Sequence, residues 1–218
     1  LMHFPWNSEL FAAHSNLTIW LNVKISVSLH TTTQFSLPMN AFSAFALVLP
    51  LPLFFLLHDV EELIFQHRWM LRHGPELCSR FPRLRFLITH LSRLTTPAFA
   101  IAATEELLLL LGLTTYMLYD GPYAMWIWSA AFMAFSLHLA VHLLQGILVR
   151  GYVPGLVSSL LLLPWAGYGL WSLHLVMPLH SMCLCGLCGV AVIALNLGFA
   201  HRLGKWICSK RHTSSPQT

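Results

Sequence analysis

Charged residues are scarce in this sequence. Of its 218 residues, 9% are Asp, Glu, Lys or Arg, whereas 56% are hydrophobic. Soluble domains carry roughly 25% charged residues, so the composition excludes an ordinary soluble globular protein. The net charge of +4 does not indicate nucleic-acid binding. Several apolar stretches exceed the roughly 18 residues that indicate a membrane helix. The sequence therefore predicts an all-α, polytopic helix bundle in a lipid bilayer.

Cysteine is also sparse, and its spacing gives no clear site. Three of the 5 cysteines form CLCGLC at residues 183–188. No second Cys/His pair stands at ligand spacing, so this segment does not predict a thiolate metal site. Small apolar packing residues are the favoured interpretation, although a disulfide there stays open.

Five apolar segments predict about five transmembrane helices. Gly and Pro mark the turns between them, as in YDGPY at 119–123. Together the segments predict a membrane domain over residues 39–206. The expected spans are residues 40–65, 96–119, 123–149, 152–171 and 180–203.

Basic residues predict the orientation of the bundle. Six Arg lie between the first two spans, Arg150 lies between the third and fourth, and more Lys and Arg follow the fifth. The connections at 119–123 and 174–180 contain none. Because basic connections stay in the cytoplasm, we expect the N-terminus outside and the C-terminus inside, in a membrane of the bacterial inner-membrane type. Residues 207–218 are then a short basic cytoplasmic tail.

Residues 1–38 fit none of the predicted spans. This stretch is polar and rich in Ser and Thr, with no clear period. Three interpretations stay open. It is an irregular extracytoplasmic extension, upstream sequence before a natural start at Met39, or a weak signal peptide without clean regions.

Five of the eight acidic residues lie inside or at the edge of apolar spans. A charged side chain costs roughly 2.5 kcal/mol or more at the bilayer centre, and such residues usually face the bundle interior and mark a functional site. The alternative is that they extend to the membrane interface, which suits Asp59 best. The five acids are Asp59, Glu61, Glu62, Glu105 and Glu106.

Helical spacing places several polar residues on shared faces. Glu61 and Glu62 stand three and four residues after His58, and His142 stands four after His138, so each set shares a face. With a rise of about 1.5 Å per residue, these residues should lie in one layer in the cytoplasmic half of the bundle. The same layer should contain Glu105, Glu106 and Asn196, and Gln145 stands three residues after His142 on the same face.

The side chains of this layer predict a metal site. Closely spaced buried carboxylates repel one another unless a cation lies between them. Nitrogen and oxygen donors without thiolate suit one or two ions of Zn, Fe or Mn. The alternative is a metal-free hydrogen-bond or proton-relay network of the same residues. The predicted ligands are His58, Glu62, Glu105, Glu106, His138 and His142.

Three blocks of the sequence resemble a known family. They are HDVEE at 58–62, AATEELLLLL at 102–111 and HLAVHLLQGILVRGYVPG at 138–155. The chain resembles the HXXEE-motif integral membrane proteins over about residues 40–206. The resemblance implies a family without an assigned function, in which the His and Glu residues suggest an enzyme. In the third block, the matching positions are His138, His142, Gln145, Arg150, Tyr152, Pro154 and Gly155.

The leading functional hypothesis is a membrane metalloenzyme whose site opens to the cytoplasmic leaflet. A metal-activated water would serve hydrolysis, and an iron site would serve oxidation, of a lipid-like or membrane-partitioned substrate. Glu61 or Glu62 is the expected acid/base, because adjacent side chains point about 100° apart on a helix. Arg150 is either a substrate-binding cation or an ordinary positive-inside anchor. Gln145, Tyr152 and Asn196 are expected around the ligands, and Asp59 is expected to find a partner near the surface.

Two other functions stay open. A proton- or metal-coupled transporter is disfavoured because no internal repeat and no pair of broken helices is visible. An intramembrane glutamic protease is suggested by EELIF at 61–65. The resemblance to that family requires an Arg where Gln66 stands and a Phe where Ala134 stands.

Overall fold

A computed structural model describes residues 41–213, and this part of the chain is helical without strands. The predicted all-α class is therefore confirmed. The expectations for residues 1–38 and for the end of the basic tail fall outside the described residues. The elements are α2 (Ala41–Val48), α3 (Pro50–Arg80), the 3-10 helix η1 (Pro82–Leu84), α4 (Arg85–Ser92), α5 (Thr96–Leu118), α6 (Ala124–Val149), α7 (Leu156–Val176) and α8 (Leu179–Thr213).

Four of these helices are long and apolar enough to cross a membrane. They are α5, α6, α7 and the segment Leu179–Lys210 of α8. The expected first span, residues 40–65, covers α2 and the first half of α3. Helix α3 does not meet the same criterion, because the acids of HDVEE interrupt its apolar run. The count of about five spans is therefore not confirmed: four helices qualify by length and composition, and the crossing by α3 stays a prediction.

Helix α3 is longer than its predicted span. It continues beyond Phe65, through Pro75, to Arg80. The chain then turns through η1 into α4, which packs against α3. The Nη2 of Arg80 donates a hydrogen bond to the carbonyl of Leu148 at 2.7 Å. One of the predicted cytoplasmic arginines therefore satisfies a carbonyl at the C-terminal end of α6, which has no partner within its own helix.

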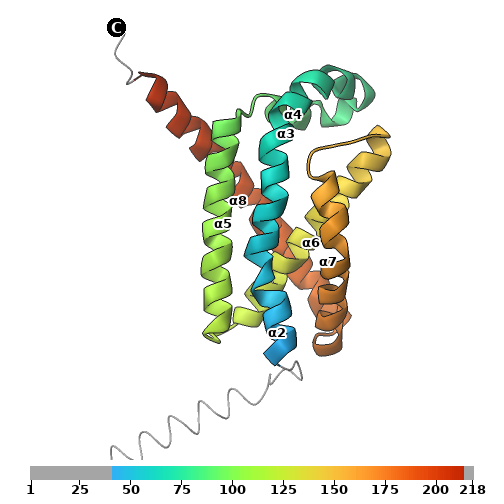
Figure 1. Cartoon of the computed structure of the whole chain (residues 1–218), viewed down its shortest axis with the longest axis vertical. Helices are drawn as coiled ribbons and strands as arrows, with labels where there is room; N and C mark the ends of the chain where they lie inside the picture. The colour runs from blue at the N-terminus through green and yellow to red at the C-terminus, as the bar shows by residue number, and fades with distance from the viewer. Residues whose placement is uncertain (1–40, 214–218) are drawn as a thin grey trace, which may run out of the picture. The chain divides into compact units, whose positions relative to one another are not determined.

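Close backbone contacts fix α8 against its neighbours. A Cβ at Gly204 would collide with the carbonyl of Ala98 on α5, and one at Gly189 would collide with the carbonyl of Ala130 on α6. Glycine therefore lets α8 approach both helices in turn as it crosses the bundle (Figure 1). This crossing brings the middle of α8 beside the polar layer.

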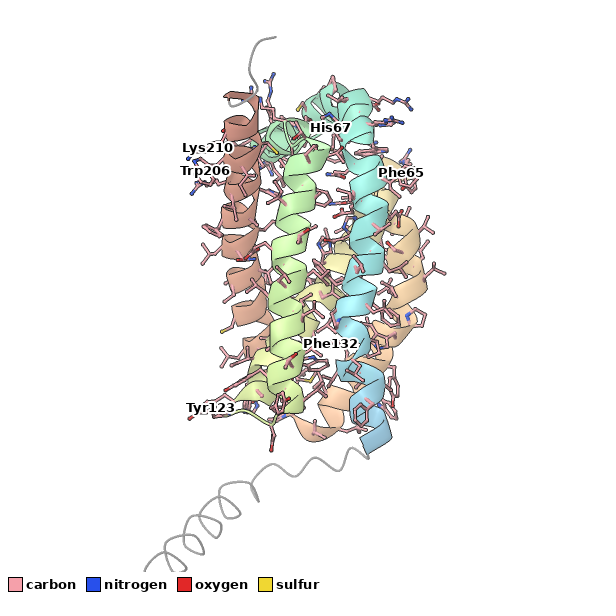
Figure 2. All side chains as sticks on the ribbon, turned by 60° about the vertical axis from the view of Figure 1, so that its left-hand side comes forward. Phe65, His67, Tyr123, Phe132, Trp206 and Lys210 are labelled. Atoms are coloured by element: carbon pink, nitrogen blue, oxygen red, sulfur yellow. The ribbon has the colours of Figure 1, made fainter. Side chains whose placement is uncertain are left out.

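The basic connections gather at one end of the bundle. The C-terminal end of α3, α4 and the C-terminal part of α8 lie together, opposite the turn between α5 and α6 (Figure 1). Trp206 and Lys210, whose ammonium lies 4.3 Å from the Trp206 ring centroid, are at the former end, and Tyr123 is at the latter (Figure 2). The side of the membrane on which this basic end lies stays a prediction.

A topology experiment follows from this arrangement. Helix α6 has 26 residues, which gives a length of about 39 Å, enough to cross the bilayer. Reporter domains inserted after Tyr119 and after Gly151 should lie on opposite sides of the membrane, with the Gly151 insertion cytoplasmic. Paired alkaline-phosphatase and fluorescent-protein insertions measure this, and the same location for both sites would contradict the bundle topology.

Candidate metal site

Four side chains from α3 and α6 converge on one point. His58 and Glu62 come from α3, and His138 and His142 come from α6. One ligand atom from each lies within 4.8 Å of the others. The Nε2 of His138 is 3.0 Å from the Nε2 of His58 and 3.1 Å from the Nε2 of His142. The Nε2 of His142 is 3.3 Å from Oε1 of Glu62.

These separations fit a bound cation. Zinc–nitrogen bonds of 2.0–2.1 Å in a tetrahedral site hold their nitrogens about 3.3 Å apart. Without a cation, His138 would face two imidazole nitrogens with a single N–H to offer. The three nitrogens and one carboxylate oxygen could therefore hold a divalent ion.

A hydrogen-bond chain sets the orientation of His58. The hydroxyl of Ser158, at the start of α7, donates to Oε2 of Glu61 at 2.6 Å. The same hydroxyl oxygen lies 3.0 Å from Nδ1 of His58, so it accepts the Nδ1–H. This places the lone pair on the Nε2 of His58, directed at His138. Carboxylate-linked histidines of this kind are typical of metal sites.

Glu61 ties α3 to the N-terminus of α7. Its carboxylate also accepts the backbone N–H of Val157 at 3.2 Å and of Ser158 at 2.7 Å. The hydroxyl of Tyr152 donates to it at 2.9 Å. The first amides of a helix lack partners within the helix and favour negative charge. Glu61 is therefore engaged by α7 and its preceding loop, and it is not among the four converging side chains.

Gly155 lets the loop before α7 close over the histidines. Its φ is +83°, a conformation that glycine adopts readily. A Cβ at this position would stand 2.8 Å from the His142 ring and 2.9 Å from the His58 ring. The loop backbone therefore covers one side of both imidazoles, and a larger residue would displace them.

A large cavity adjoins the four side chains. Its volume is about 960 Å³, and it lies among α3, α4, α5, α6 and α8. His138 lines it, which explains why that residue has accessible surface. Most of the lining is apolar, from residues such as Leu109, Leu113 and Ile127. The polar lining consists of Asp59, Glu62, Gln66, Glu106, His138, His142, Gln145, Asn196 and His201.

The two glutamates of α5 take different positions. Glu105 accepts a hydrogen bond from Nδ2 of Asn196 at 3.0 Å. Glu106 lines the cavity, and its Oε1 is buried without a hydrogen-bond partner. Neither belongs to the group of four converging side chains. Asn196 itself lines the cavity and links α8 to α5.

The remaining predicted site residues lie farther out. Gln145 lines the cavity one turn beyond His142. Tyr152 reaches the site through Glu61. Arg150 is exposed and adopts the left-handed conformation with φ of 58°, where its backbone N–H closes the end of α6 on Ile147. No side-chain hydrogen bond or ion pair of Arg150 occurs within residues 41–213.

Three features of the site were not predicted from the sequence. Asp59 was expected near the surface, but it is 8% exposed and lines the cavity. That expectation is wrong because Asp59 and Glu62 are three residues apart and share a helix face. Ser158 and Gly155 were not expected in these roles. The Pro-Gly pair at 154–155 signals only a turn, and nothing local shows that it covers two histidines.

Ser158 offers a test of the site. Ser158→Ala removes the group that links His58 to Glu61, and such outer contacts are worth about 10–100-fold in metal affinity. We expect zinc affinity to fall by that factor, as measured by competition with a chromogenic chelator. Ser159→Ala is the matched control, because the Ser159 hydroxyl is buried without a partner. Equal affinities in both variants would contradict the role of Ser158.

The family comparison agrees with these positions. The family described as "Protein of unknown function with HXXEE motif" matches residues 49–169, which is more than half of the chain and includes all four converging side chains. No curated protein and no solved structure matches the chain. The chain therefore belongs to the HXXEE-motif family, whose function is unknown.

Proposed function

We propose that this protein is a membrane metalloenzyme acting on a lipid-like substrate. The observation that carries the proposal is the convergence of three imidazoles and one carboxylate at the wall of a largely apolar cavity. Ligand sites are mostly apolar with a few converging polar groups. In this cavity, the polar groups are the side chains that would hold a divalent ion.

His58, His138 and His142 are the proposed nitrogen ligands, and Glu62 is the carboxylate ligand. A divalent cation held there supplies a Lewis acid and lowers the pKa of a water bound to it. The loop at Gly155 and the apolar lining restrict water around these residues. The cavity, through which a substrate would approach, lies on the side of His138.

Glu106 is the proposed acid/base residue, because Glu62 already serves as a ligand. Both line the cavity, and Oε1 of Glu106 has no hydrogen-bond partner. A general base needs a free oxygen within reach of the substrate or water. Glu61 is less suited, because four donors already occupy its carboxylate. This division of the adjacent glutamates also argues against a glutamic protease.

The substrate is proposed to be lipid-like because of what surrounds the site. Leucine, isoleucine, valine and phenylalanine side chains from five helices line most of the cavity. A lining of this kind can accept a hydrocarbon chain from the bilayer without exposing that chain to polar groups. The metal found in the purified protein decides the reaction class: zinc favours hydrolysis, whereas iron favours oxidation.

Metal content tests the proposed ligands directly. Protein purified in mild detergent should contain about one divalent ion per chain by elemental analysis, given one complete group of four donors. His142→Ala should lose it, because only three donors remain. Glu105→Gln is the control, since Glu105 contacts Asn196 instead of the site. Full metal content in His142→Ala would contradict the site.

Metal removal should also lower stability. A ligand that binds only the folded state at 100 times its dissociation constant stabilises that state by about 2.7 kcal/mol. Zinc added to chelator-treated protein should therefore raise the thermal midpoint, as followed by intrinsic tryptophan fluorescence. The same addition to His142→Ala should leave the midpoint unchanged, and an equal rise in both proteins would place the binding elsewhere.

A further inference from the structure

At the basic end of the bundle, His201 of α8 lines the cavity and contacts His90 of α4. The Nε2 of His90 lies 3.4 Å from the Nδ1 of His201. His201 is 4% exposed and lines the cavity, and its Nε2 is buried without a hydrogen-bond partner. Buried polar groups are normally paired. The free nitrogen of His201 is therefore available to a ligand in the cavity.

Positive charge surrounds this histidine pair. Burial, followed by the charges of Lys205 and Arg202, lowers the pKa of the His90 imidazole. Lys205 stands four residues after His201 on α8, so the two side chains share a helix face beside the cavity. Neither Lys205 nor Arg202 forms an ion pair with a carboxylate in residues 41–213. An anion would therefore meet uncompensated positive charge at this end of the cavity.

The opposite end of the cavity is apolar. From the metal site, the lining continues along α6 through Ala134 and Ala131 to Ile127. Ala131 lies two turns, or about 10 Å, beyond His138. Leu113 of α5 and Leu184 of α8 line the same region. This part of the cavity offers no charged side chain and suits a hydrocarbon chain.

The three zones lie in a fixed order along α8. Asn196 marks the level of the polar layer, because it contacts Glu105. His201 lies five residues farther along the helix, or about 7.5 Å toward the basic end. Leu184 and Cys188 lie on the other side of Asn196. A molecule that fills the cavity would place its polar end at His201 and pass Glu62, His138 and His142 on its way to the apolar end.

We propose that the cavity binds a single-chain anionic amphiphile, with its phosphate or carboxylate head at His201 and Lys205 and its hydrocarbon chain extending past His138 to Ala131. The proposal rests on the proposed function and names the substrate class of that site. A cavity of about 960 Å³ lies at the upper end of the range for a single small ligand. The apolar zone favours a lipid over a free phosphate ion, because a phosphate ion alone would leave that zone empty.

Binding measurements on full-length protein test the head site. The probes are three C16 molecules: a lysophosphatidic acid, palmitate and an uncharged monoacylglycerol. Calorimetric titration should show that the anionic probes bind about tenfold more tightly, as expected for hydrogen bonds to a charged group. His201→Leu and Lys205→Ala should each reduce this preference. His174→Leu, an exposed histidine at the other end, is the control and should keep it.

A second variant tests the chain site. Ala131→Phe should fill the apolar end of the cavity, and overpacking of this kind is unfavourable. The substitution should weaken the binding of C16 palmitate by about tenfold. It should leave the binding of a C8 fatty acid unchanged, because the shorter chain stops before residue 131. Equal losses for both chain lengths would place the hydrocarbon elsewhere.

Further measurements distinguish binding at the head site from binding at the metal site. All titrations are repeated after chelator treatment, and the anionic preference should persist without metal. Loss of metal binding in His142→Ala with a retained anionic preference would support a head site that is independent of the metal site. Equal affinity for charged and uncharged probes in the wild-type protein would overturn the head site.

Competition by inorganic phosphate as effective as that by lysophosphatidic acid would overturn the lipid assignment. Helix content by circular dichroism, measured on every variant, confirms that each one is folded.

Discussion

The structure of the site depends on the carboxylate of Glu61. It accepts two backbone N–H groups at the start of α7 and the hydroxyls of Tyr152 and Ser158. Burying a charged group in an apolar bundle is costly unless hydrogen bonds compensate it. Here a helix N-terminus supplies both the donors and the favourable dipole. The same interaction fixes α7 against α3 and orients His58, so the packing of the bundle and the geometry of the site have one origin.

The three histidines connect this hydrogen-bonded arrangement on α3 to α6. With the Nδ1–H of His58 accepted by Ser158, its Nε2 directs a lone pair at His138. His138 and His142 present their Nε2 atoms to each other and to the same point. Three mutually close acceptor nitrogens attract a cation, and Glu62 adds a negative oxygen beside them. The cavity then determines which molecules can reach these ligands.

The sequence predicted the elements of this site better than their roles. The four-residue spacings of His58 with Glu62 and of His138 with His142 define faces on two helices, and rise per residue placed them at one level. The choice between Glu61 and Glu62 could not be made, because both share a face with His58. That choice depends on where α7 begins. Likewise, the division of Glu105 and Glu106 follows from the rotation of α5, which its backbone contact with Gly204 helps to fix.

The segment HDVEE shows why so much charge occurs within an apolar run. Its four polar residues project in three directions: His58 toward α6, Glu61 toward α7, and Asp59 with Glu62 into the cavity. Each direction offers a different compensation, namely imidazole neighbours, helix N-terminal amides and a cavity with polar walls. A helix separates adjacent residues by about 100°, so a five-residue stretch can serve all three. The same charges would be costly on a face directed at lipid. Their distribution therefore requires that α3 be covered by α6 and α7 and open to the cavity.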